Sequence, residues 1–188
     1  FDLPYRRLAD AVEEAYAAGL FGRNILGSDF SCDIVVYRGA GAYVAGEASG
    51  LISSLEGKKG YPRNRPPRLT VRGLYQRPTV VNNVESLSNI AWIINHGADA
   101  FKAVGTPKSP GTRLFSVSGH INRPGVYEVE LGYPWMKFLD EDCGGVPHGR
   151  AIKCVVPGGV SSKVLTGADI ANLKLSHEDL WDAGSTLG

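Results

Sequence analysis

The sequence is poor in cysteine, with three in 188 residues, and this limits the chemistry open to it. Cys32, Cys143 and Cys154 lie far apart and form no CxxC pair. This argues against a disulfide framework and against a cysteine metal site, so we expect no bound metal. Reduced thiols that are buried or half-buried, in a reducing cytoplasm, are the better interpretation.

An excess of one charge and a long hydrophobic run are also missing. The net charge is +1, with 20 basic and 19 acidic residues, which leaves no electrostatic surface for nucleic acid or anionic lipid. The apolar stretch 87–94 is interrupted by Ser88 and Asn89, and a bilayer span needs about 20 apolar residues. A globular protein without membrane insertion is therefore expected. The first residue, Phe1, and the glycine-rich last turn suggest an internal piece of a longer protein.

The first hundred residues show the pattern of an α/β layer. Apolar spacing and a glycine stop predict a helix over residues 2–19, and a β-branched run predicts a buried strand over 30–37. Small residues at 39–47 lead into a second helix. A basic, proline-rich loop follows at 57–67, and Asn82, with Glu three residues on, is predicted to cap a third helix. This order is typical of helices packed on a sheet.

The remaining residues have a different order of elements. Alternating patterns predict a hairpin of strands 113–118 and 126–131. A short helix over 133–140 and a strand over 151–156 follow, and Ser176 starts a last helix. A hairpin, a helix and a further strand are the opening order of a β-grasp domain.

The turn at residues 39–47 is the first candidate site. Glycines at a strand-to-helix turn let a flat ligand or a phosphate approach the backbone. Tyr43 and Glu47 would lie one helical turn apart and could face one ligand. A tight structural turn with a surface carboxylate is the alternative.

A basic loop and two adjacent asparagines are the other candidates. Five cations could meet a dinucleotide pyrophosphate through charge-assisted hydrogen bonds, although a solvated loop is the simpler alternative. Asn82 and Asn83 could bind a flavin or phosphate oxygen at a helix start, where capping explains one asparagine better than two. The five cations are Lys58, Lys59, Arg63, Arg65 and Arg68.

Together these stretches resemble the flavin-binding NADH dehydrogenase subunit of respiratory complex I and its hydrogenase and formate dehydrogenase relatives. The resemblance lies in residues 39–47, 54–67 and 78–85. Residues 114–131 and the Pro-Gly-Gly at 157–159 resemble the soluble-ligand-binding β-grasp domain that follows in that family.

The resemblance implies that FMN and NADH share one cavity, where hydride passes to the flavin and electrons leave through a four-iron cluster. Glu47 would be the catalytic residue. Arg65 occupies a position where the family usually has Lys facing NADH. The implied cofactor-binding residues are Tyr43, Gly46, Glu47, Arg65, Asn82 and Asn83.

The implied fold is α/β (α+β), in three parts of a longer chain. These are the C-terminal part of a Rossmann-like FMN/NADH-binding domain (1–111), a β-grasp domain (112–167) and the start of a linker (168–188). The parent would be an NADH:quinone, or other acceptor, oxidoreductase. It would be cytoplasmic and peripheral to the inner membrane, held by other subunits of a complex I-like or hydrogenase-like assembly.

Three departures from the family pattern limit what this chain can do alone. Ala48 replaces a second acid after Glu47, and Arg68 replaces an aromatic after the Pro-Pro pair. The family's glycine-rich FMN phosphate loop and its cluster cysteines are not in this sequence. We therefore expect the chain alone to hold no 4Fe-4S cluster, to bind FMN poorly and to be inactive. The alternative is a non-catalytic paralogue that serves as a ligand-binding or subunit-docking module.

Overall fold

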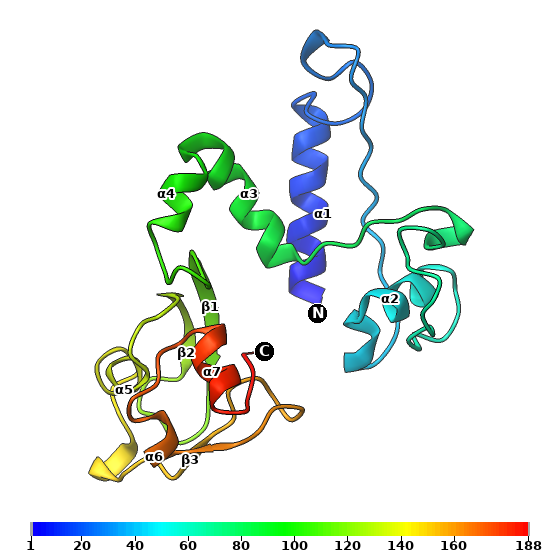
Figure 1. Cartoon of the computed structure of the whole chain (residues 1–188). Coiled ribbons are helices and arrows are strands. Elements are labelled where there is room, and N and C mark those ends of the chain that lie inside the picture. The colour runs from blue at the N-terminus through cyan, green and yellow to red at the C-terminus, as the bar shows by residue number, and fades with distance from the viewer. Residues whose placement is uncertain (1, 188) are drawn as a thin grey trace. The chain divides into compact units, whose positions relative to one another are not determined.

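A computed structural model describes residues 2–187, which divide into two compact units (Figure 1). The first unit extends to Val81 and the second begins at Asn82. None of the helices in residues 2–187 is long and apolar enough to cross a membrane.

The first unit contains two α-helices joined by long irregular segments. The helix predicted over residues 2–19 is confirmed as α1 (Asp2–Ala17), and Gly19, with φ of +69°, ends it in the left-handed conformation that favours glycine. The helix after the glycine-rich turn is confirmed as α2 (Ala48–Leu55). The short 3₁₀ turns are η1 (Ile25–Gly27), η2 (Tyr43–Gly46) and η3 (Leu74–Gln76).

The strand predicted over residues 30–37 is wrong. Only Cys32 of this run pairs, in an isolated bridge to Gly22, and most apolar residues after it are open to solvent, with Val35 84% exposed. A β-branched run prefers a strand because it packs on a sheet. Residues 2–81 offer it no neighbouring strand. The segment is held instead by the Tyr16 hydroxyl, which accepts from the Ile34 amide at 3.0 Å.

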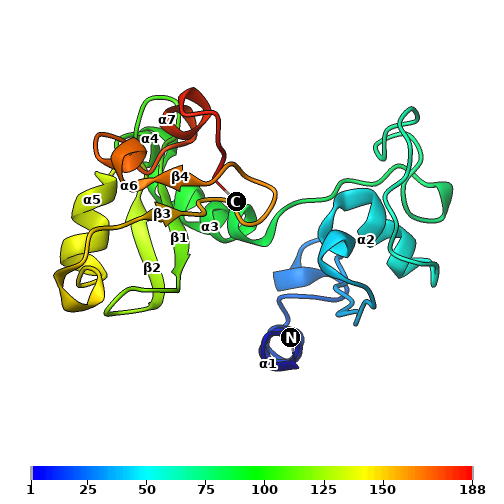
Figure 2. The same cartoon turned by 90° about the horizontal axis from the view of Figure 1, so that it is seen from below.

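The second unit confirms the predicted hairpin. Strands β1 (Thr112–Val117) and β2 (Gly125–Glu130) pair antiparallel, from Thr112 opposite Glu130 to Val117 opposite Gly125. The strand predicted over 151–156 is shorter, as β3 (Cys154–Val155), and pairs with β4 (Leu165–Thr166). Figure 2 shows both pairs with helices around them.

Seven helical segments complete the second unit. The one predicted over 133–140 is shifted by two residues and divides into α5 and the π-helix η4, and the last begins after Ser176 as predicted. The segments are α3 (Val84–His96), α4 (Ala98–Lys102), α5 (Trp135–Lys137), η4 (Phe138–Asp142), η5 (Pro147–Gly149), α6 (Gly167–Ile170) and α7 (His177–Asp182).

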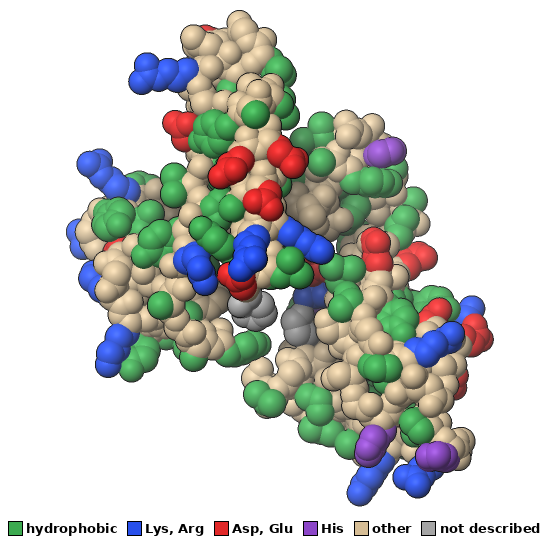
Figure 3. All heavy atoms as spheres, turned by 180° about the vertical axis from the view of Figure 1, so that it is seen from behind, with side chains coloured by type: hydrophobic (Ala, Val, Ile, Leu, Met, Phe, Trp, Pro, Cys, Tyr) green, Lys and Arg blue, Asp and Glu red, His purple; other side chains and the backbone are tan. Residues whose placement is uncertain are grey.

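The larger hydrophobic core lies in the second unit. Phe138, Leu165 and Leu180 are at most 2% exposed there, whereas within residues 2–81 the one buried large apolar side chain is Ile52 on α2. Helix α1, with 16 residues, has none that is fully buried. Hydrophobic side chains are consequently open to solvent on the face shown in Figure 3.

The cysteines follow the sequence expectation in two of three cases. Cys143 is buried in the core, and burial raises the pKa of its thiol. Cys32 is half-buried, but Cys154 is exposed, which corrects the expectation for that residue. Its strand β3 has only two residues, so little of the chain covers it.

Candidate functional site

Glu47, the predicted catalytic residue, caps the N-terminus of α2. Its Oε2 accepts from the amides of Ser49 (2.9 Å) and Gly50 (3.0 Å) and from the Ser49 hydroxyl (2.5 Å). The Ser49 hydroxyl, followed by the Gly50 amide, holds the pKa of Glu47 below its usual range, because each hydrogen bond favours the charged form. Glu47 is therefore a fixed anion at neutral pH.

The other oxygen of Glu47 meets a predicted cofactor contact. An Nη2 of Arg65 donates to Oε1 at 3.2 Å, and the two side chains remain 57% and 37% exposed. The structure thus brings Glu47 and Arg65 together at a partly open position. Such an exposed pair contributes little to stability and can rearrange around a ligand.

Tyr43 and Gly46 form an open turn directly before this carboxylate. Tyr43 is 93% exposed, and a Cβ placed on Gly46 would meet no atom within 4 Å. Tyr43 does not share a helical face with Glu47, as the sequence spacing suggested, because η2 ends at Gly46 and Glu47 is extended with ψ of 135°. The aromatic ring and the glycine backbone are therefore both open to solvent.

A polar stripe on α2, which the sequence analysis missed, holds the basic loop. Ser49, Ser53 and Glu56 are spaced by four and three residues and so lie on one helical face. The Arg63 amide donates to Ser49 Oγ at 2.8 Å, and Arg63 Nε donates to Ser53 Oγ at 3.0 Å. The spacing of these two hydroxyls and one carboxylate could have predicted the polar stripe from the sequence.

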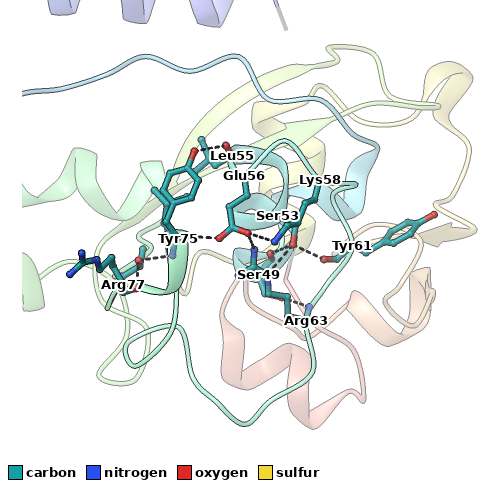
Figure 4. Close-up of polar contacts among 11 residues, drawn as sticks. Ser49, Ser53, Leu55, Glu56, Lys58, Tyr61, Arg63, Tyr75 and Arg77 are labelled. Atoms are coloured by element: carbon teal, nitrogen blue, oxygen red, sulfur yellow. Dashed lines mark hydrogen bonds and ion pairs between the residues drawn. The ribbon is translucent and has the colours of Figure 1, made fainter.

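Glu56 is the centre of this network (Figure 4). Its Oε2 accepts from Lys58 and from Arg63, both at 2.8 Å, and its Oε1 accepts from the Tyr75 amide at 2.9 Å. The side chain is only 4% exposed. The hydrogen bond from Lys58, with those from Tyr75 and Arg63, lowers the pKa of Glu56 from 4.5 to about 2. The carboxylate therefore ties both ends of the segment 57–75 to α2.

Part of the positive charge of the basic loop is therefore already engaged by contacts within the chain, and part is left for a ligand. Lys58 and Arg63 are paired with Glu56, and the Lys59 ammonium lies 5.9 Å from the centre of the Tyr61 ring. Among residues 2–187, the Arg68 side chain has no hydrogen-bond or ion-pair partner. The loop thus keeps free positive charge beyond Arg63.

The two adjacent asparagines have different environments. Asn83, rather than Asn82, is the N-cap of α3: its Oδ1 accepts from the Ser86 amide at 3.2 Å, which corrects the sequence prediction. Within residues 2–187 the exposed Asn82 side chain makes no hydrogen bond, so its amide is available to a ligand. Because these residues begin the second unit and Tyr43 and Glu47 belong to the first, a shared cavity stays a prediction. Within the described chain, no three His, Cys, Asp or Glu side chains are grouped as metal ligands.

The chain resembles a known protein family and solved structures. Residues 3–92 match the family described as the Nuo51 FMN-binding domain. This match covers just under half of the chain, and the resemblance to flavin-binding NADH dehydrogenase subunits is confirmed.

Named relatives agree with the family match over nearly the whole chain. The chain is 50% identical over 183 residues to the F subunit of NADH-quinone oxidoreductase from Mycobacterium tuberculosis, covering 97% of this chain and 41% of that protein. The corresponding F subunit from Streptomyces coelicolor is 48% identical over 183 residues, with 97% and 40% covered. The chain therefore spans about two fifths of the length of these relatives.

A solved structure is also similar. The crystal structure of an NAD⁺-reducing [NiFe]-hydrogenase in the air-oxidized state matches with a TM-score of 0.67 and 41% identity, over 74% of this chain and 24% of that one. With the helices and small sheets described above, this places the chain in the mixed α/β class.

Proposed function

We propose that this chain is part of an NADH-oxidising flavoprotein and supplies one part of its flavin and nicotinamide cavity. The family match covers Tyr43, Glu47, Arg65 and both asparagines. The relatives are named as NADH-quinone oxidoreductase subunits and an NAD⁺-reducing hydrogenase. The proposed domains are the C-terminal part of a Rossmann-like FMN/NADH-binding domain and a β-grasp domain.

The observation that supports this most is the fixed carboxylate of Glu47 beside an open aromatic and glycine turn. Tyr43 and Gly46 would lie against the flavin and nicotinamide rings, and Asn82 and Asn83 would hydrogen-bond FMN. FMN, when bound, would supply the capacity to accept hydride from NADH, which the protein itself does not have. The nicotinamide gains positive charge as it is oxidised, so a preorganised anion at Glu47 favours the oxidised form.

The rest of the proposed parent lies outside this chain. A 4Fe-4S cluster would take electrons from the flavin, and other subunits of a complex I-like or hydrogenase-like assembly would hold the protein in the cytoplasm at the inner membrane. The alternative, a non-catalytic docking module, is not favoured, because the named relatives are oxidoreductases.

Replacing Glu47 by Gln in the intact parent should slow NADH-dependent reduction of an artificial acceptor. Loss of a fixed charge near the nicotinamide should reduce kcat by about tenfold, equivalent to about 1.4 kcal/mol. Steady-state kinetics with ferricyanide, together with the FMN content of each preparation, provide the measurement.

Glu14→Gln is the matched control, because Glu14 is an exposed carboxylate on α1. It should leave the rate unchanged. If Glu47→Gln also retains the full rate with FMN bound, Glu47 is not in the catalytic cavity. Flavin fluorescence titration of this chain and of its parent then tests whether FMN binds tightly to the parent but not to this chain.

A further inference from the structure

A small cavity in the first unit is lined by positive charge without any acid. It has a volume of about 190 Å³, and its eight lining residues include Arg63, Arg65 and Arg72. The polar part of the wall is completed by three neutral hydrogen-bonding side chains, Ser49, Asn64 and Gln76. Guanidinium groups with such neighbours are typical of sites that bind phosphate.

The three arginines differ in how far their charge is already neutralised. Arg63 is paired with Glu56, which also pairs with Lys58, so that carboxylate serves two cations. Arg65 is paired with Glu47 at 3.2 Å. Arg72 is exposed, and its side chain has no partner among residues 2–187. The three arginines and Lys58 together carry four positive charges, and within the described part of the chain only two carboxylates, Glu47 and Glu56, are paired with them.

The polar stripe on α2 holds the Arg63 side chain and the backbone near Arg72. Arg63 is held by Ser53 and Glu56, and the Tyr75 amide bound to Glu56 holds the chain just beyond Arg72. The Arg72 amide itself donates to the Arg68 carbonyl at 2.9 Å. The Arg63 side chain and the backbone around Arg72 are thus held before any ligand arrives, which lowers part of the ordering cost of binding.

We infer that this cavity is an anion subsite that binds a phosphate group of a nucleotide, with Arg72 as its uncompensated donor. Whole small-molecule sites occupy about 300–1,000 Å³, so a cavity of 190 Å³ takes one group of a larger ligand. The identity of that ligand as a nicotinamide dinucleotide rests on the proposed function. The group that binds in the cavity is either the pyrophosphate of the dinucleotide or a phosphate on its ribose.

Calorimetric titration of the 188-residue chain with inorganic pyrophosphate at low salt tests the inference. Arg72→Gln should weaken binding about tenfold, and Arg72→Lys should weaken it less, because lysine keeps the charge but loses the planar fork. Arg77→Gln is the control, since Arg77 is an exposed arginine outside the cavity lining. It should change the affinity less than twofold.

Equal weakening by Arg72→Gln and Arg77→Gln would show general charge attraction and overturn the subsite, as would an absence of binding. Displacement of pyrophosphate by NADP⁺ or by NAD⁺ supports a nucleotide phosphate, and stronger displacement by NADP⁺ identifies the ribose phosphate. If neither displaces it, the nucleotide assignment fails. The kinetics of Glu47→Gln in the parent decide the proposed function separately, because pyrophosphate binding to this chain does not require hydride transfer.

Discussion

Replacing Phe138 by Ala is expected to lower the free energy of unfolding of the second unit by about 3–5 kcal/mol. Phe138 is 2% exposed at the junction of α5 and η4. Its ring lies 6.0 Å from that of Phe115 and meets the ring of Tyr127 edge-on at 5.5 Å. Removal of the ring would leave a cavity between the hairpin and the helix that covers it, and both ring contacts would be lost.

Urea unfolding followed by tryptophan fluorescence measures this effect. All three tryptophans, Trp92, Trp135 and Trp181, belong to the second unit and so report on it alone. Val160→Ala is the control, because Val160 is fully exposed, and it should change stability by no more than about 0.5 kcal/mol. A loss of under about 1 kcal/mol for Phe138→Ala would mean that this core collapses around the vacancy.

The sequence predicted best those elements whose signals are local. The hairpin of β1 and β2, the start of α7 at Ser176 and the end of α1 before Gly19 all appear where expected. Each depends on alternation, a capping side chain or a positive φ within a few residues. Such signals act within the element itself, so they need no knowledge of the rest of the fold.

Signals that depend on distant partners were less informative. The run 30–37 has strand composition, but a strand also needs a neighbour, which residues 2–81 do not provide. The choice between Asn82 and Asn83 as a cap is set by the backbone entering α3, where Asn83 has φ of −73° and ψ of 141°. Glu85, three residues after Asn82, favoured Asn82 as the cap by the capping-box rule, but the backbone conformation gives that place to Asn83.

The candidate site was predicted in part. The sequence singled out Glu47 and Arg65 separately, and the structure places them in one ion pair. It did not predict that Glu47 would also be the cap of α2, because a carboxylate at a glycine-rich turn resembles a ligand contact and a cap alike. The positive charge of Lys58 and Arg63 made them candidates for pyrophosphate, but Glu56 already binds them.

Glu56 should therefore be the charged residue of the first unit whose replacement costs most. Glu56→Gln removes the charge that two cations and the Tyr75 amide share, and a hydrogen bond to a charged group contributes about 1.5–3 kcal/mol. We expect a loss of about 2 kcal/mol in local stability of the segment 57–75. Hydrogen exchange of the Tyr75 amide, corrected for the intrinsic rate at each pH, reports this directly.

The same carboxylate should make this segment sensitive to acid. Because the folded pKa of Glu56 is lowered from 4.5 to about 2, its contribution is complete above about pH 4.5 and is lost as the pH falls towards 2. Protection of the Tyr75 amide should thus differ between wild type and Glu56→Gln at pH 6 and converge near pH 2. Glu14→Gln, which removes an exposed carboxylate, should follow wild type throughout. A difference that persists unchanged at pH 2 would show that Glu56 stabilises the loop through shape and neutral hydrogen bonding, and that its charge contributes nothing.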